Sequence, residues 1–236
     1  AGAGLFGIWV GTFSLTPLAS TGIAAAVMVL VTLAASRHLL PYGGDAGGKL
    51  LALPKGIVTF VGIIACIAFL VEGAIMDWGG VFLTTVRHFD MALAGTGFTV
   101  FSAAMLTMRL LGDWTVQKLG QERVVIGGSL LAVAGFLFII FAPTVVLLYL
   151  GFFFIGVGCA NVVPVFFSLL GKQHVMPISL AVPAVSTLGY LGILMGPAAI
   201  GFIAHQTSLY AAFTLLAALV LLQAVIAAYV YHHIVE

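Results

Sequence analysis

Long, continuous runs of apolar residues dominate the chain, and short polar segments separate them. A helix needs about 20 apolar residues to cross a bilayer, whereas a barrel strand alternates apolar and polar residues with a period of two. The runs here are long and do not alternate, so the pattern predicts transmembrane helices. Seven complete spans are expected, at about residues 21–35, 57–76, 93–111, 124–141, 145–170, 177–204 and 209–231. Residues 1 to about 13 are interpreted as the closing turns of a further helix whose start is absent.

The composition supports this interpretation. Hydrophobic residues make up 63% of the 236 residues, charged residues only 6%, and the mean hydropathy is +1.27. Soluble domains contain about 25% charged residues, so a water-exposed surface cannot be built from this chain. The net charge is +1 and no basic stripe appears, which argues against nucleic-acid binding. Cys66 and Cys159 lie in apolar runs without a CxxC or His cluster, so no disulfide framework, metal site or cofactor is expected.

The loop charges predict the orientation. If the crossings alternate, seven of the eight Lys and Arg residues fall on one side and only Arg87 falls on the other. Cytoplasmic loops carry such an excess, which places the C-terminus in the cytoplasm, with the bacterial inner membrane as the expected location. The seven are Arg37, Lys49, Lys55, Arg109, Lys118, Arg123 and Lys172.

Glu72 is the only formal charge within the apolar run 57–76. A carboxylate in hydrocarbon is costly, and it usually faces a cavity or a partner and marks an ion or substrate path. The alternative is a structural carboxyl group held neutral by neighbouring helices. Counting from Lys55, Glu72 is expected about 22 Å into a core of about 30 Å, in the outer leaflet. Asp77, beside the interfacial Trp78, is either a solvated helix-end group or a second functional carboxylate.

Four motifs resemble the C-terminal half of the major facilitator superfamily of secondary transporters. The segment Arg109-x-x-Gly112-Asp113-x-x-x-x-Lys118-x-Gly120-x-x-Arg123 is similar to the family's cytoplasmic loop motif between helices eight and nine. Gly156-x-Gly158-x-x-Asn161-x-x-Pro164 resembles the tenth helix, and Gly189-Tyr190-x-Gly192-x-x-x-Gly196-Pro197-x-x-Gly201 resembles the eleventh. Glu72-Gly73-Ala74-x-x-Asp77-Trp78 is similar to the seventh helix of the sugar-permease-like branch that includes fucose:proton symporters.

The resemblance implies an all-α membrane protein with the end of helix five and helices six to twelve of that fold. Residues 1–36 would then end the N-terminal bundle, 37–55 would form the cytoplasmic inter-bundle linker, and 56–236 would form the C-terminal six-helix bundle. The remainder of the N-terminal half would be missing. In the family, the loop motif is a conformational latch. Trp114 stands where a basic residue is common, which weakens the charge network of the motif.

The remaining candidate residues have competing interpretations. Arg109 and Asp113 are four residues apart, within pairing distance on a helix, although Arg109 is also near enough to the cytoplasmic end to snorkel. Asn161 is either a substrate-facing amide or a helix–helix hydrogen-bonding group, and the two are equally weighted. Tyr190 is a candidate cavity residue. The segment containing Gly189, Gly192, Gly196 and Pro197 is a candidate hinge or gate, or else close helix packing.

The favoured function is secondary active transport of a small solute, such as a sugar or related polar metabolite, by alternating access. Glu72 would exchange a proton with the cavity, so the expected partners are the solute, the proton and the lipid bilayer. The alternatives are a drug or metabolite exporter of the same fold and a non-transporting assembly subunit. An enzyme is not expected, because no HExxH, GxSxG or paired-carboxylate arrangement is present within the spans.

Overall fold

The computed structural model describes residues 16–36 and 53–234, which belong to two separate units. The first unit, residues 1–48, contains the helix α2 (Pro17–Ser36), which matches the first predicted span and begins a few residues before it. The predicted tail of residues 1–13 and the Gly-rich part of the linker lie outside the described residues. The second unit, residues 49–236, contains every other described helix.

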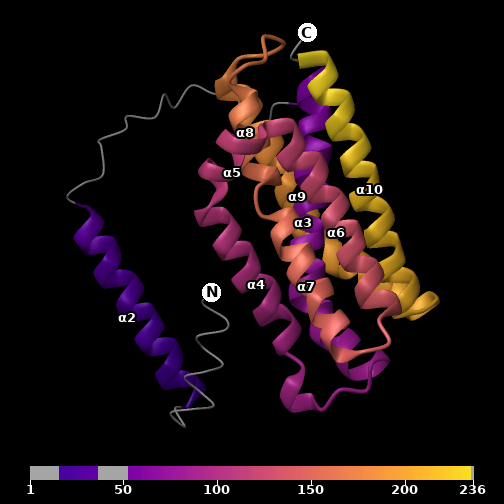
Figure 1. Ribbon diagram of the computed structural model, residues 1–236. Helices are drawn as coiled ribbons and strands as arrows, with labels where there is room; N and C mark the ends of the chain where they lie inside the picture. The colour runs from indigo at the N-terminus through magenta and orange to yellow at the C-terminus, as the bar shows by residue number, and fades with distance from the viewer. Residues whose placement is uncertain (1–15, 37–52, 235–236) are drawn as a thin grey trace. The chain divides into compact units, whose positions relative to one another are not determined.

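In its described part, the second unit is an up-and-down helical bundle (Figure 1). Six stretches are long and apolar enough to cross a membrane, namely 57–86, 91–110, 121–141, 145–170, 178–206 and 209–233. They correspond to the last six predicted spans, so the predicted fold class is confirmed. The helices are α3 (Ile57–Val81), η1 (Phe82–Val86), η2 (Met91–Leu93), α4 (Thr96–Leu110), α5 (Gly112–Leu119), α6 (Gln121–Phe141), α7 (Val145–Cys159), α8 (Val162–Leu170), α9 (Ile178–Gln206) and α10 (Leu209–Ile234).

Two predicted loops are partly helical. Residues 112–119, expected to be a loop, form α5, and the segment after Val81 continues as the π-helical turn η1 before it breaks. The span 145–170 is divided into α7 and α8 at Ala160 and Asn161. Pro164 explains this break, because proline has no N–H to donate to the carbonyl four residues earlier.

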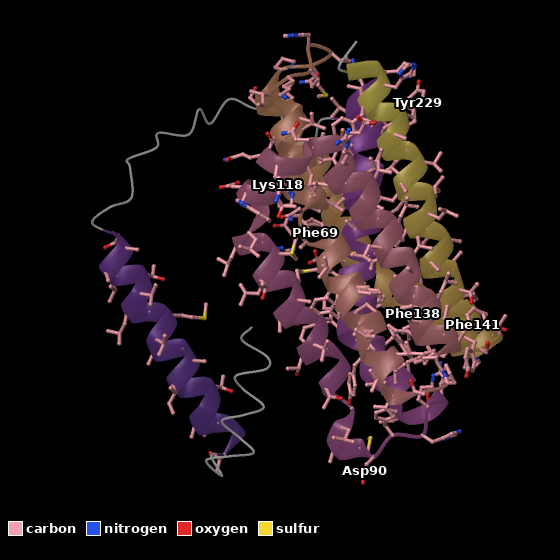
Figure 2. The ribbon with its side chains drawn as sticks, viewed as in Figure 1. Phe69, Asp90, Lys118, Phe138, Phe141 and Tyr229 are labelled. Carbon is pink, nitrogen blue, oxygen red and sulfur yellow. The ribbon has the colours of Figure 1, made fainter. Side chains whose placement is uncertain are left out.

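The charged connections lie at the two ends of the bundle. The start of α3, the helix α5 and the end of α10 lie at one end, hereafter the α5 end (Figure 1). The opposite end holds η1, η2 and the α6–α7 turn. Figure 2 shows Lys118 on α5 and Asp90 far apart along the bundle axis. The assignment of the α5 end to the cytoplasm stays a prediction.

Glycine allows the closest helix contacts in the bundle. On α9, a methyl group at Gly192 would overlap the carbonyl oxygen of Cys66 on α3, and one at Gly189 would lie 2.8 Å from the Phe69 ring. Between α6 and α7, a methyl group at Gly135 would lie 2.6 Å from the carbonyl oxygen of Gly151. In a membrane, lipid provides no hydrophobic driving force for helix association, so helices associate through close packing, which small residues permit. Close packing therefore accounts for the α9 glycines, and their hinge role stays a prediction.

Two polar contacts fix neighbouring helices inside this apolar packing. Gln223 of α10 donates a hydrogen bond of 2.9 Å to the Ser129 hydroxyl oxygen of α6, and both side chains are buried. Arg87, after η1, donates to the carbonyl oxygens of Ile139 and Ile140 at 2.6 and 2.8 Å. A cation suits this place because the last carbonyls of a helix lack intrahelical donors and carry partial negative charge.

We expect Gly192→Ala to destabilise the bundle by about 1–3 kcal/mol, the usual effect of overpacking a filled interior. The added methyl group would have to displace the α3 backbone at Cys66. Gly127→Ala in α6 is the matched control, since nothing lies within 4 Å of the added carbon. Thermal unfolding of the purified protein in detergent measures both, and equal unfolding temperatures for the two variants would contradict the packing role.

Candidate functional site

Glu72 lies near the middle of the longest described helical stretch, residues 57–86. Its side chain is 19% exposed, and one carboxylate oxygen lies 2.8 Å from a terminal guanidinium nitrogen of Arg109 on α4. The helical stretch continues beyond Trp78 to Val86, so Glu72 lies close to its midpoint along the chain. The outer-leaflet depth of Glu72, counted from Lys55, stays a prediction.

Arg109, in the last turn of α4, points inward rather than toward the helix end. Besides the ion pair, its Nε donates to the carbonyl oxygen of Ala160 at 3.3 Å. That carbonyl lies four residues before Pro164, so no backbone N–H completes its helical hydrogen bond. The proline thus leaves the Ala160 carbonyl without its helical donor, and Arg109 donates to this carbonyl instead. The interpretation of Arg109 as a snorkelling residue at the cytoplasmic end is therefore wrong.

Asn161, at the break between α7 and α8, ties that break to the end of α4. Its Nδ2 donates to the carbonyl oxygen of Met108 at 3.2 Å, one of the last four carbonyls of α4, which lack intrahelical donors. Its side-chain oxygen would lie 2.6 Å from a methyl group at Gly112, which explains the glycine in the loop motif. Asn161 is 6% exposed. Of its two equally weighted interpretations, the helix–helix hydrogen bond is formed, and a contact with substrate stays a prediction.

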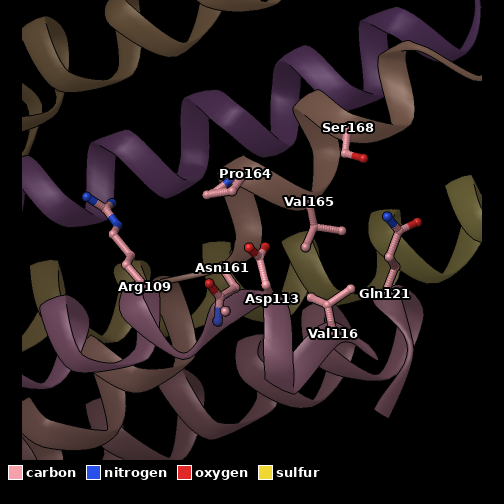
Figure 3. A pocket seen from close by; sticks show the side chains of 9 residues that line it. Arg109, Asp113, Val116, Gln121, Asn161, Pro164, Val165 and Ser168 are labelled. Carbon is pink, nitrogen blue, oxygen red and sulfur yellow. The ribbon is translucent and has the colours of Figure 1, made fainter. Parts of the chain in front are cut away.

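A cavity of about 270 Å³ lies beside these contacts at the α5 end (Figure 3). Asp113 lines this cavity, but the predicted Arg109–Asp113 pair is not formed. In Figure 3 the Arg109 side chain extends toward α3, whereas Asp113 points to the opposite side of Asn161. The helical path ends at Leu111 between α4 and α5, which removes the i,i+4 geometry that the prediction needed. The lining residues are Arg109, Gly112, Asp113, Val116, Gln121, Asn161, Pro164, Val165 and Ser168.

The rest of the loop motif forms α5 and its junction with α6. The Lys118 ammonium group lies 5.0 Å from the centre of the Trp114 ring, which is a cation–π contact. Trp114 makes this contact at the position where the family commonly has a basic residue. Gly120 joins the two helices with φ +85°, which favours glycine. Arg123 follows in the first turn of α6. Asp113 has no ion-pair partner within the described part of the bundle.

Tyr190 lies beside the Glu72 helix rather than beside Asn161. Its ring stacks on Phe69 with centres 6.0 Å apart, and its side chain is 62% exposed. Phe69 precedes Glu72 by three residues, so both lie on one face of α3. Phe69, Glu72, Arg109 and Tyr190 therefore form a single partly exposed group, hereafter the α3 face. The sequence alone did not single out Phe69.

Asp77 and Trp78 lie nearer the other end of α3. Asp77 is exposed, with no ion-pair partner in residues 53–234. Trp78 donates its indole N–H to the carbonyl oxygen of Pro197 at 2.9 Å, and its ring would touch a methyl group at Gly201 at 2.7 Å. Trp78 therefore joins α3 to α9 in addition to any interfacial role. The described residues contain no cluster of three or more His, Cys, Asp or Glu side chains able to hold a metal ion.

Comparisons with known proteins agree with this architecture. A family model described as the Major Facilitator Superfamily matches residues 61–234. An uncharacterised MFS-type transporter of Yersinia pestis is 42% identical over 215 residues, which cover 91% of this chain and 55% of that protein. An uncharacterised transporter of Sinorhizobium fredii is 34% identical over 183 residues, covering 78% of this chain and 48% of that one. The chain thus spans about half the length of these curated relatives.

A solved structure shares the fold. The crystal structure of the POT family transporter PepTSo superimposes with a TM-score of 0.58 at 22% identity. The match covers 75% of this chain and 38% of that one. At this identity the likeness concerns the fold alone.

We expect Arg109→Gln to lower the unfolding temperature more than Glu72→Gln does. Removing Arg109 leaves both the Glu72 carboxylate and the Ala160 carbonyl without their donor, whereas Glu72→Gln retains the bond to Ala160. Thermal unfolding in detergent measures both effects. The double variant should be no less stable than Arg109→Gln, because the uncompensated carboxylate is then gone. Equal and additive losses would contradict this account.

Proposed function

The chain belongs to the Major Facilitator Superfamily, and from this premise we propose that it forms the C-terminal half of a proton-coupled secondary transporter. The transporter moves a small polar solute across the membrane by alternating access. The resemblance of the Glu72 segment to the sugar-permease-like branch supports a sugar or related polar metabolite as the solute. The excess of Lys and Arg at the α5 end supports a cytoplasmic location for that end and for the C-terminus, in a bacterial inner membrane.

The ion pair between Glu72 and Arg109 carries this proposal. Two opposite charges lie 2.8 Å apart near the middle of a membrane-spanning helix, where charges are costly and are kept for function. Neither side chain is fully buried, so water or solute can reach the pair from the exposed side of the α3 face. A carboxylate that is paired in one state and accessible in another is suited to take up and release a proton.

The α3 face supplies half of the solute site. Phe69, one turn before Glu72, stacks on Tyr190, and the two rings offer an apolar surface and a phenol hydroxyl. Sites for small solutes combine aromatic walls with a few placed polar groups. The other half of the site comes from the N-terminal bundle, in keeping with relatives about twice as long as this chain.

The loop motif acts as the latch between the two halves. Asp113 lines the cavity at the α5 end, is exposed, and has no ion-pair partner among residues 53–234. We assign its partner in the latched state to a cation or helix N-terminus of the other half. The contacts of Asn161 and Gly112 hold α5 in position for this docking.

We expect Glu72→Gln to abolish solute-driven proton movement, because an amide cannot carry the coupled proton. The protein is reconstituted into liposomes containing a pH-sensitive dye, and a panel of sugars, polyols and sugar acids is added outside. Counterflow of the same solutes is measured in parallel, and the amide variant should retain exchange. Asp77→Asn is the matched control on the same helix. Wild-type proton movement in Glu72→Gln would rule out this role for Glu72.

We expect Asp113→Asn to slow counterflow severalfold while leaving the unfolding temperature of the protein nearly unchanged. The carboxylate makes no ion pair within the described bundle, so its loss should affect the docked state rather than folding. Counterflow rate and thermal unfolding are measured on the same preparation. Gln117→Ala on the exposed side of α5 serves as the control. A large loss of stability with an unchanged rate would assign Asp113 to folding instead.

A further inference from the structure

We infer that the transported solute carries a carboxylate or phosphate group, and that Arg109 binds this group when Glu72 is protonated. The inference rests on the proposed proton coupling through Glu72 and names the class of solute that this coupling requires. A sugar acid or a phosphorylated polyol has this chemistry, whereas a neutral sugar lacks it.

The charge balance of the ion pair leads to this solute class. In the observed state the Glu72 carboxylate and the Arg109 guanidinium neutralise each other at 2.8 Å. Uptake of a proton by Glu72 removes the negative charge, while arginine keeps its positive charge under all physiological conditions. An uncompensated cation at the level of a membrane-spanning helix is costly. The protonated state is therefore stabilised by an anion that arrives from outside.

Arg109 stays in place through this exchange. The bond from its Nε to the Ala160 carbonyl does not involve Glu72, and Pro164 leaves that carbonyl without a backbone donor. Arginine has five N–H donors, and the contacts of Arg109 with Ala160 and Glu72 engage only Nε and one terminal nitrogen. The side chain is 44% exposed. The guanidinium group is planar, accessible and held in place by its bond to Ala160, so it can pair with two oxygens of a carboxylate or phosphate.

The neighbouring titratable groups do not supply the missing negative charge. Asp113 lies on the other side of Asn161 from the guanidinium, as Figure 3 shows, and the bond to Ala160 holds Arg109 away from it. Cys159 of α7 is a free cysteine that is buried among apolar side chains, where it acts as a small hydrophobic residue. Tyr190 of α9 offers a phenol hydroxyl rather than a carboxylate. Asp77 lies on the exposed side of α3 beyond Met76.

The test uses Glu72→Gln as a stand-in for the protonated state, with acetate and inorganic phosphate as ligands. Acetamide has nearly the shape of acetate without its charge and is the matched control. We expect acetate or phosphate, at constant ionic strength, to raise the unfolding temperature of purified Glu72→Gln saturably, by about 2–4 °C. Acetamide should have no effect. Wild type at pH 8 and Glu72→Gln/Arg109→Gln should show a much smaller rise with either anion.

The possible results of this experiment test the anion site and the proposed proton coupling independently. No saturable rise in Glu72→Gln, or an equal rise in the double variant, overturns Arg109 as an anion site. A rise with phosphatidylglycerol in mixed micelles but with neither soluble anion would assign Arg109 to a lipid headgroup and overturn the solute class. Binding is measured without a proton gradient. Anion binding by Glu72→Gln that still moves protons like wild type would therefore reject proton coupling while keeping the anion site.

Discussion

The arrangement of this bundle around Glu72 depends on Arg109 being held from two sides. One side is the Glu72 carboxylate on α3, and the other is the carbonyl of Ala160, whose backbone donor is removed by Pro164. A guanidinium group at the level of a membrane-spanning helix is costly unless an opposite charge compensates it. The Ala160 carbonyl at the break between α7 and α8 and the Glu72 carboxylate on α3 thus both bind the same guanidinium group. Arg109 thereby links α4 to α3 and to the α7–α8 break.

The rest of the bundle is held by contacts of a different kind. Helices α3 and α9, and α6 and α7, approach so closely at glycines that a single methyl group would meet the opposing backbone. Such contacts are apolar, numerous and insensitive to pH. The polar contacts between the described helices are fewer, and they include Gln223 with Ser129, Trp78 with the carbonyl of Pro197, Arg87 with the end of α6, and the group around Arg109. Close packing at glycines therefore determines how the helices are arranged. The polar contacts determine which helices are affected when a side chain gains or loses charge.

Much of the fold could be predicted from the sequence because length and apolarity alone define a membrane span. The six spans of the second unit follow from runs such as 209–231, and the superfamily follows from the loop motif around Asp113. The pairing of the charges could not be predicted in the same way. Glu72 and Arg109 are 37 residues apart, and their contact depends on where α4 ends relative to the middle of α3.

The wrong interpretation of Arg109 has a physical cause. Residue counts along each apolar run do not show how two helices are offset along the bundle. The helix of Glu72 continues through Trp78 to Val86, and α4 ends at Leu110, within one residue of the predicted end, yet Arg109 in its last turn lies beside Glu72 near the middle of α3. The role of Asn161 was undecidable for a related reason, because one amide can bind a solute or a free carbonyl equally well. Only the position of Met108 decides which acceptor is near.

The separation of the pair along the chain also has a consequence for biogenesis. A ribosome adds roughly 5–20 residues per second, so α3 emerges seconds before Arg109 has been synthesised. During that interval Glu72 has no guanidinium partner, and a carboxyl group that enters hydrocarbon alone does so most easily in its neutral form. The ion pair therefore forms only after Arg109 has been synthesised, 37 residues after Glu72. The chemistry that we assign to the working transporter, exchange between a neutral acid and a paired carboxylate, is one that Glu72 first undergoes as the protein is assembled.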